Sequence, residues 1–92
     1  MRYQKTTVIR DEIGIHIRPA SRIVTEARRF DAQIWIQDVM TGKSANAKSI
    51  LMLLSLSLSG GKKVCISAEG DDAPEAVNVL ARLVESELAE GR

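Results

Sequence analysis

The chain has 92 residues, of which 45% are hydrophobic and 27% are charged. This length supports one compact core and leaves no room for a second, so we expect a single domain over residues 1–92. The 13 basic and 12 acidic residues nearly cancel, and aromatic residues make up only 3%, so neither an overall field nor base stacking favours nucleic acid as a partner.

The single cysteine, Cys65, excludes an internal disulfide framework and a cysteine-based metal cage. A domain without such staples relies on its core, which suits a reducing compartment, so we expect a cytoplasmic protein. The longest apolar run, residues 50–54, is far too short to span a bilayer, and the polar start of the chain lacks the apolar centre of a signal peptide. We therefore expect no membrane insertion.

The first half of the chain predicts strands around one helix. Residues 3–9 are rich in Thr, Val and Ile, which is typical of a strand. Apolar residues then recur at helical spacing from Ala20, and this helix should end near Phe30. Residues 32–37 alternate between apolar and polar, as in a half-buried strand, and a short strand should return at residues 43–47 after a turn.

Residues 49–58 fit two patterns. The apolar residues at positions 50, 53 and 54 have the spacing of a helix, whereas the leucines at 54, 56 and 58 alternate as in a strand. We predict a short helix that ends at Gly60 and Gly61, because glycine commonly follows the last turn of a helix.

One strand and one helix should complete the chain. Residues 62–68 predict a strand with its apolar side chains on one face. Asp71 or Asp72 can cap the next helix, and Pro74 suits its first turn. The residues that this helix should bury on one stripe are Ala76, Leu80, Leu83, Val84 and Leu88.

The resulting order is strand, helix, strand, strand, helix, strand, helix. Each strand hides one face only, so helices should cover one side of an antiparallel sheet. The other face should stay open, with Trp35 and Cys65 on it.

The only histidine, His16, lies where the first helix should begin, in the segment GIHIRPA of residues 14–20. The first amides of a helix have no internal partner and carry the positive end of its dipole, so they stabilise an anion. Imidazole is a nucleophile near neutral pH, and a phosphoryl group on it could meet the amides of Ile17 and Arg18 and the Arg18 guanidinium, without a metal. A capping histidine beside a solvated arginine explains the same spacing, and spacing alone favours this simpler interpretation.

Two segments together resemble one family. GIHIRPA resembles the active-site signature of HPr, the histidine-containing phosphocarrier of the bacterial sugar phosphotransferase system. NAKSIL, residues 46–51, resembles the serine-phosphorylation signature of the same family. The resemblance covers essentially the whole chain and implies an α+β fold of the βαββαβα type. This fold is an open-faced β-sandwich, with a four-stranded antiparallel sheet and three helices on one face, and the family resemblance suggests a monomer.

The resemblance implies a carrier rather than an enzyme with its own turnover, and it implies no cofactor. His16 would accept a phosphoryl group on Nδ1 from Enzyme I, which takes it from phosphoenolpyruvate, and would pass it to a histidine of a IIA domain of a sugar permease. Arg18 would be the charge partner of this group. Ser49 would be modified by HPr kinase/phosphorylase in hosts that have it, and a transcriptional regulator would read the modified form.

The sequence departs from the family pattern in three places. Ile17 replaces a small residue that usually follows the histidine, and Ile13 stands where many members have a polar residue able to cap the helix. The turn at residues 38–43 is longer than hairpin norms by about two residues. We expect these differences to affect the rate of transfer and the choice of partner.

A partner surface is expected around the second helix. Lys48 and Arg18 suit acidic partners, although an ordinary solvated charge explains any one lysine. A short helix on a sheet cannot bury all of the apolar run at residues 50–54, so part of it should face solvent, and Leu51 is our choice for the interface. The expected contact residues are Ile17, Lys48, Ile50, Leu51 and Leu54.

Two other functions stay open. Ile13 and Ile17 motivate an HPr-like protein that works mainly in regulation, as in nitrogen-type phosphotransfer chains. A docking module that never carries phosphate is the third interpretation, and the presence of His16 argues against it.

Overall fold

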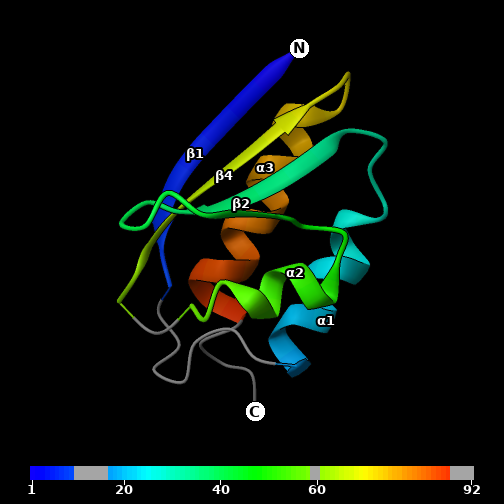
Figure 1. Cartoon of the computed structure of the whole chain (residues 1–92). Coiled ribbons are helices and arrows are strands. Elements are labelled where there is room, and N and C mark those ends of the chain that lie inside the picture. Colours follow the sequence, from blue (N-terminus) through cyan, green and yellow to red (C-terminus); the bar gives the residue numbers. More distant parts are fainter. Residues whose placement is uncertain (10–16, 59–60, 88–92) are drawn as a thin grey trace.

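In a computed structural model of the chain, helices cover one face of a four-stranded sheet (Figure 1). The structure describes residues 1–9, 17–58 and 61–87. The strands are β1 (Arg2–Val8), β2 (Gln33–Asp38), β3 (Ser44–Asn46) and β4 (Lys63–Glu69). The helices are α1 (Ile17–Ala27), α2 (Ile50–Ser55), α3 (Ala73–Arg82) and a π-helical turn, η1 (Leu83–Glu87).

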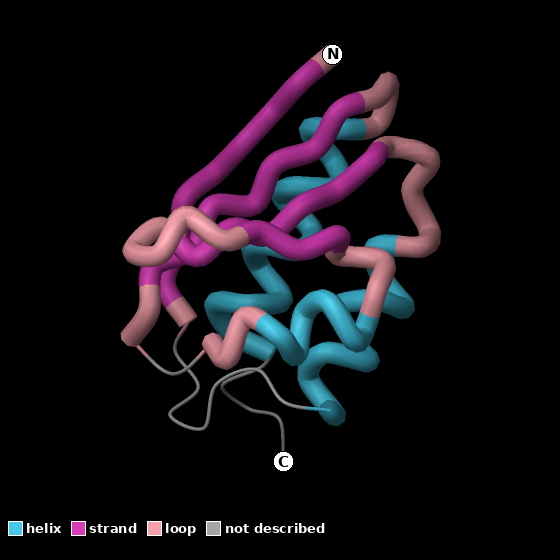
Figure 2. The backbone as a smooth tube through the Cα atoms, viewed as in Figure 1, coloured by secondary structure: helices cyan, strands magenta, loops and turns pink. Residues whose placement is uncertain are grey.

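The strands lie in the order β1-β4-β2-β3, and each neighbouring pair is antiparallel. Figure 2 shows the strands in one layer and the helices in another. The predicted α+β class, the order of elements and the open-faced arrangement are confirmed. Within the described segments, no helix combines the length and the apolar content that crossing a membrane requires.

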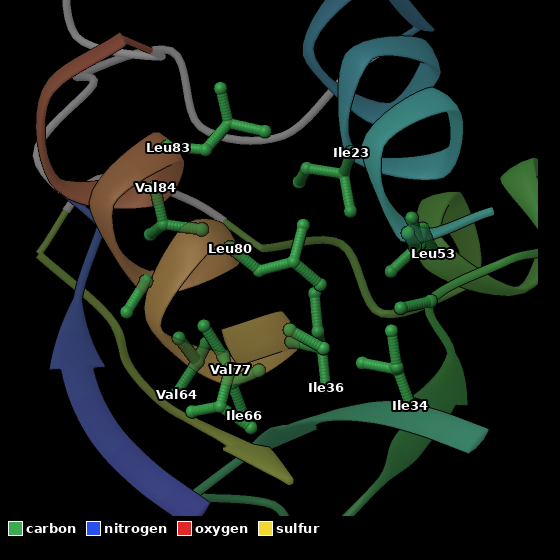
Figure 3. Packing of buried hydrophobic residues seen from close by; sticks show 14 of the residues in the cluster. Ile23, Ile34, Ile36, Leu53, Val64, Ile66, Val77, Leu80, Leu83 and Val84 are labelled. Atoms are coloured by element: carbon green, nitrogen blue, oxygen red, sulfur yellow. The ribbon is translucent and has the colours of Figure 1, made fainter. Parts of the chain in front are cut away.

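The core lies between these two layers. Ile36 of β2 lies opposite Ile66 of β4 in the sheet register, and both side chains are fully buried. Figure 3 shows Ile36 next to Leu80 of α3 and Ile66 beside Val77 of the same helix. Ile23 of α1 and Leu53 of α2 belong to the same cluster. Alternation along the strands therefore supplies one wall of the core, and one stripe from each helix supplies the other.

Trp35 and Cys65 lie on the open face of the sheet, as predicted, and both are half-buried. They share a hollow there with Arg2, Gln4, Gln37, Ser44 and Ser67. The polar neighbours explain why this face tolerates water without a helix to cover it.

The first helix ends earlier than predicted. Its last helical residue is Ala27, and the next residues form tight turns in which the amides of Arg29 and Phe30 donate to the carbonyls of Glu26 and Ala27. The Phe30 side chain is nevertheless buried, at 8% exposure. Phe30 therefore fits the helical spacing of buried residues although it lies in the turn after the helix, because its side chain still packs into the core.

The predicted end of the second helix at Gly60 and Gly61 is wrong. The helix ends at Ser55, with Leu56 as its C-cap, and Ser57 adopts a positive φ of 52° that stops it. Leu56 and Leu58 are both buried although they lie beyond the last helical residue. Both patterns in this segment are therefore real: a short helix comes first, and alternating leucines follow it.

Asp72 occupies the N-cap position of α3, but its side chain makes no capping hydrogen bond. Its carboxylate instead accepts from the backbone amides of Asp31 and Ala32, at 2.9 Å each. Two amides in the turn before β2 are paired by one carboxylate, which satisfies more donors than a single cap would. Pro74 lies in the first turn of α3, as predicted.

The C-terminal helix buries most of its predicted stripe. Leu83 and Val84 are buried within the π-helical turn, at 4% and 0% exposure, while Leu88 lies outside the described residues. The same turn places the Glu85 carboxylate to accept from the buried hydroxyl of Thr7 in β1. This contact joins the end of the helix to the edge of the sheet.

Candidate functional site

Helix α1 begins at Ile17, the residue directly after the only histidine. Its 11 residues form a regular helix, so its first amides have no partners inside it. No acidic residue lies in the first turn to occupy the positive end of the dipole. An anion just before Ile17 would therefore meet a favourable field.

Several predicted site residues fall where little is described. His16 and Ile13 lie outside the described residues. The backbones of Ile17 and Arg18 are helical, so both residues stand in the first turn of α1, where the predicted phosphoryl-binding amides should be. The side-chain roles of Ile17 and Arg18 remain predictions.

Lys48 anchors the other end of α1. Its ammonium donates to the carbonyl of Phe30 at 2.7 Å, and the Arg28 guanidinium returns a bond to the Lys48 carbonyl at 3.1 Å. Carbonyls at the end of a helix lack internal partners and carry partial negative charge, so an ammonium is stabilised there. The pair of bonds ties the end of α1 to the segment that leads into α2.

This position separates Lys48 from the first turn of α1. An 11-residue helix is about 16 Å long at 1.5 Å per residue, and Lys48 contacts the turn beyond its far end. Lys48 is also half-buried, so it is not the ordinary solvated charge that a single lysine suggests. The contact shows it as a brace between helices.

Ser49 is the N-cap of α2. Its backbone is extended, and its hydroxyl accepts from the amide of Met52 at 3.3 Å. A serine hydroxyl in this geometry satisfies one of the unpaired amides at the start of a helix. The hydroxyl that the family resemblance marks for phosphorylation thus also sets the first turn of α2.

Helix α2 carries an exposed apolar patch. Leu51 is 81% exposed, Met52 is 45% exposed and Ile50 is 37% exposed. We call these three residues the α2 patch. Leu54, which we also expected to contact a partner, is not part of this patch. Its side chain is half-buried and packs against the core. Met52 is a member that the sequence reasoning missed, although its place beside Leu51 could have indicated it.

The α2 patch belongs to the helical layer that contains α1. Helices α1 and α2 pack against each other, and Figure 1 shows α2 crossing beside α1. The start of α1 and the α2 patch therefore belong to neighbouring elements. The α2 patch is therefore carried by the helix that packs against α1.

Sequence reasoning also missed a buried ion pair. The Asp38 carboxylate is 1% exposed, accepts from the Lys62 ammonium at 3.2 Å and accepts from the Met40 amide at 3.0 Å. Burial alone would raise the pKa of this carboxyl, but the hydrogen bond and charge of Lys62, with the backbone donors of Met40 and Thr41, hold the pKa below its ordinary value. The pair fastens the β2–β3 hairpin to the start of β4.

The turn between β2 and β3 is long, as predicted. The Asp38 amide donates to the carbonyl of Lys43, and four residues lie between them where a minimal hairpin has about two. Gly42 in this turn has a φ of 79°, which explains the glycine.

Among the described residues, no three histidine, cysteine, aspartate or glutamate side chains gather as a metal ion would require.

Comparisons with known proteins agree with the fold. Residues 3–86 match the family model PTS-HPr, described as "PTS HPr component phosphorylation site". The phosphocarrier protein HPr of Vibrio cholerae is 47% identical over 83 residues, which cover 90% of this chain and 95% of that protein. The HPr-like protein Crh of Bacillus subtilis is 39% identical over 85 residues, which cover 92% and 98%.

Solved structures give the same result. The crystal structure of HPr-C-His from Thermoanaerobacter tengcongensis matches with a TM-score of 0.86 and 42% identity, over 94% of each chain. An HPr dimer from the same organism matches with a TM-score of 0.72 and 43% identity, over 89% of this chain and 92% of that one. The family match includes the histidine segment, the first helix and Ser49.

Proposed function

The chain belongs to the HPr family of phosphocarrier proteins, and from this membership we propose that His16 is the residue that carries the phosphoryl group. The observation that supports this proposal most directly is the start of α1 at Ile17, next to the only histidine. Proteins of this family carry a phosphoryl group between partners rather than convert a substrate of their own.

The chemistry of the proposed step is a direct transfer. The lone pair of Nδ1 of neutral His16 attacks the phosphorus, the bond from phosphorus to its donor breaks, and the donor keeps that electron pair. The new N–P group carries negative charge just before the first turn of α1. The amides of Ile17 and Arg18 and the Arg18 guanidinium are the groups we propose to stabilise it.

We propose Enzyme I as the donor and IIA domains of sugar permeases as acceptors. The start of α1 and the α2 patch lie on packed helices, so one partner surface can cover both. Leu51 is the member of this surface with the largest exposed fraction. In this proposal Lys48 orients the two helices for a partner, because its ammonium is already bonded to Phe30.

We propose that Ser49 is a regulatory phosphorylation site where the host has HPr kinase/phosphorylase, with a transcriptional regulator reading the phosphorylated form. A phosphate there would add a charge of about −1.5 to −2. It would also replace the hydroxyl that now accepts from Met52. Acidic surfaces that dock on α2 would then be repelled.

A second candidate is a mainly regulatory role in a phosphotransfer chain. The similarity to the HPr-like protein Crh favours it, as does Ile17 in place of a small residue. Such a protein would dock on regulators through α2, and its loss would leave growth on a transported sugar unchanged.

The deciding experiment mixes the protein with phosphoenolpyruvate, Mg²⁺ and a bacterial Enzyme I and follows intact mass. We expect one added phosphoryl group that acid removes and that His16→Ala abolishes. Ser49→Ala is the matched control and should still accept the group. Transfer to the His16→Ala variant would contradict the proposal.

A chain that gains no mass would be tested again as Ile17→Ala. Recovery of labelling would show that Ile17 restricts the choice of Enzyme I. Failure of both variants would favour a docking module that carries no phosphate. We further propose a single-domain cytoplasmic monomer, and sedimentation would show whether this chain instead dimerises like the Thermoanaerobacter relative.

A further inference from the structure

The tip of the β2–β3 hairpin presents large apolar side chains to solvent. Met40 is 88% exposed and Val39 is 45% exposed. They border a largely apolar hollow between the hairpin and the start of β4, and we call this the hairpin surface. Its lining residues are Asp38, Val39, Met40, Gly61, Lys62 and Lys63. Exposed apolar side chains that border a hollow are a common feature of docking surfaces.

The hairpin surface is held in one conformation. The buried Asp38 carboxylate binds the Lys62 ammonium and the Met40 amide, and the Val39 amide donates to the carbonyl of Lys63 at 3.1 Å. At the tip, the Gln37 side-chain amide donates to the carbonyl of Gly42. A preorganised apolar surface loses little conformational entropy when a partner binds.

The rim of this surface is basic. Lys62 and Lys63 line the hollow, and Lys43, at the end of the hairpin turn, is exposed. Asp38 is the only carboxylate in residues 38–43 and 61–63, and it is buried against Lys62. A partner therefore meets an apolar hollow with positive charge around it, which complements an acidic segment.

The hairpin surface is separate from the helical site. Figure 1 shows the hairpin at the left edge of the sheet, with α1 on the other side of the view. Figure 2 shows the same separation between the hairpin loop and the first turn of α2.

We propose that the hairpin surface docks an acidic partner segment that has one large apolar side chain flanked by carboxylates. The apolar side chain enters the hollow beside Val39 and Met40. The carboxylates face Lys63 on the rim. This interaction goes beyond phosphoryl transfer and requires neither His16 nor the α2 patch.

The test uses a labelled peptide with a central leucine flanked by glutamates on both sides, titrated into the full chain and followed by amide NMR shifts. We expect the shifts at Val39, Met40 and Lys63. The double variant Val39→Ser/Met40→Ser should weaken binding about tenfold. Lys63→Glu should weaken it similarly and reduce its dependence on salt, whereas Lys5→Glu, on β1, is the control that should bind normally.

Three results would overturn the proposal. Equal binding of a peptide with lysines in place of the glutamates would show that charge is not recognised. Shifts centred on α2 would place the peptide on the helical site. Self-association that the Val39→Ser/Met40→Ser variant abolishes would make the surface a contact between copies. The double variant should still accept a phosphoryl group from Enzyme I, so failure of this proposal is distinguishable from failure of the proposed carrier function.

Discussion

The ammonium of Lys48 donates to the carbonyl of Phe30 at 2.7 Å, and the residue that follows Lys48 caps the second helix. One lysine thus connects the end of α1 to the start of α2. The relative orientation of these helices determines how the start of α1 and the α2 patch face a partner. The brace lies beyond the last turn of α1, at the opposite end from Ile17 and Arg18.

Replacing Lys48 by glutamine should lower stability through this bond. The variant loses a charged donor to the Phe30 carbonyl in the turn after α1, so we expect the free energy of unfolding to fall by about 1–2 kcal/mol. Urea unfolding measures this change. Lys43→Gln, at an exposed position, is the matched control and should change stability by less than about 0.5 kcal/mol. Equal losses in the two variants would mean that the Phe30 contact contributes nothing.

Removing the hydroxyl of Ser49 should destabilise α2. We expect Ser49→Ala to lower the free energy of unfolding by about 1 kcal/mol and Ser49→Gly by only a few tenths. Amide hydrogen exchange at Met52 should speed up in the alanine variant, because that amide loses its acceptor. Unchanged exchange at Met52 would show that the cap is not formed in solution.

The fold was accessible from the sequence because alternation and helical spacing report burial directly. Ile34, Ile36 and Ile66 are buried at the positions that alternation predicts. The alternation in β2 extends one residue further than predicted and turns Asp38 inward. The sequence pattern places Asp38 in the turn, because a charged residue is not expected at a buried strand position without a partner. Its partner, Lys62, lies 24 residues away in the chain. Tertiary pairing, rather than local pattern, decides such a residue.

The candidate site shows the same limit. The position of His16 before a helix, and of Ser49 at a cap, follows from local signals that act within a few residues. The contact of Lys48 with Phe30 joins residues 18 apart, and no local pattern predicts it. The end of α2 was also missed, because burial of Leu56 and Leu58 depends on where the sheet lies.

Asp38 should make stability depend on pH in the acid range. The pKa of its carboxyl is lowered in the folded chain below the ordinary value of an aspartate. The ionised carboxylate therefore contributes stability fully above the unfolded pKa, and this contribution is lost as pH falls through the lower folded pKa. Unfolding of the wild-type chain and of Asp38→Asn across pH 2–7 should show a difference that is constant near neutrality and shrinks below about pH 4. A difference that grows toward low pH would contradict the ion pair.

Gly70 should not tolerate a side chain. A Cβ there would lie 2.8 Å from the Cα of Ala32, and the φ of 148° disfavours other residues. We expect Gly70→Ala to cost about 2 kcal/mol, because the neighbour is backbone and cannot move easily. Gly42→Ala is the control: a Cβ there meets nothing within 4 Å, so only the conformational cost of about 1 kcal/mol remains. Thermal or urea unfolding should rank the two variants in this order, and the reverse order would contradict the close packing.

Leu51 and Leu53 lie two positions apart on α2 and should behave in opposite ways. Leu51 is 81% exposed, so Leu51→Ala should change the free energy of unfolding by less than about 0.5 kcal/mol. Leu53 is fully buried, so Leu53→Ala should cost about 2–5 kcal/mol. If the α2 patch contacts Enzyme I, Leu51→Ala should raise the KM for phosphoryl transfer about five- to tenfold. Truncation of an apolar side chain at the centre of an interface removes binding free energy between the two proteins. Val39→Ala, an exposed apolar position on the hairpin, should leave this KM unchanged. A normal KM for Leu51→Ala, together with normal stability, would exclude Leu51 from the surface that receives Enzyme I.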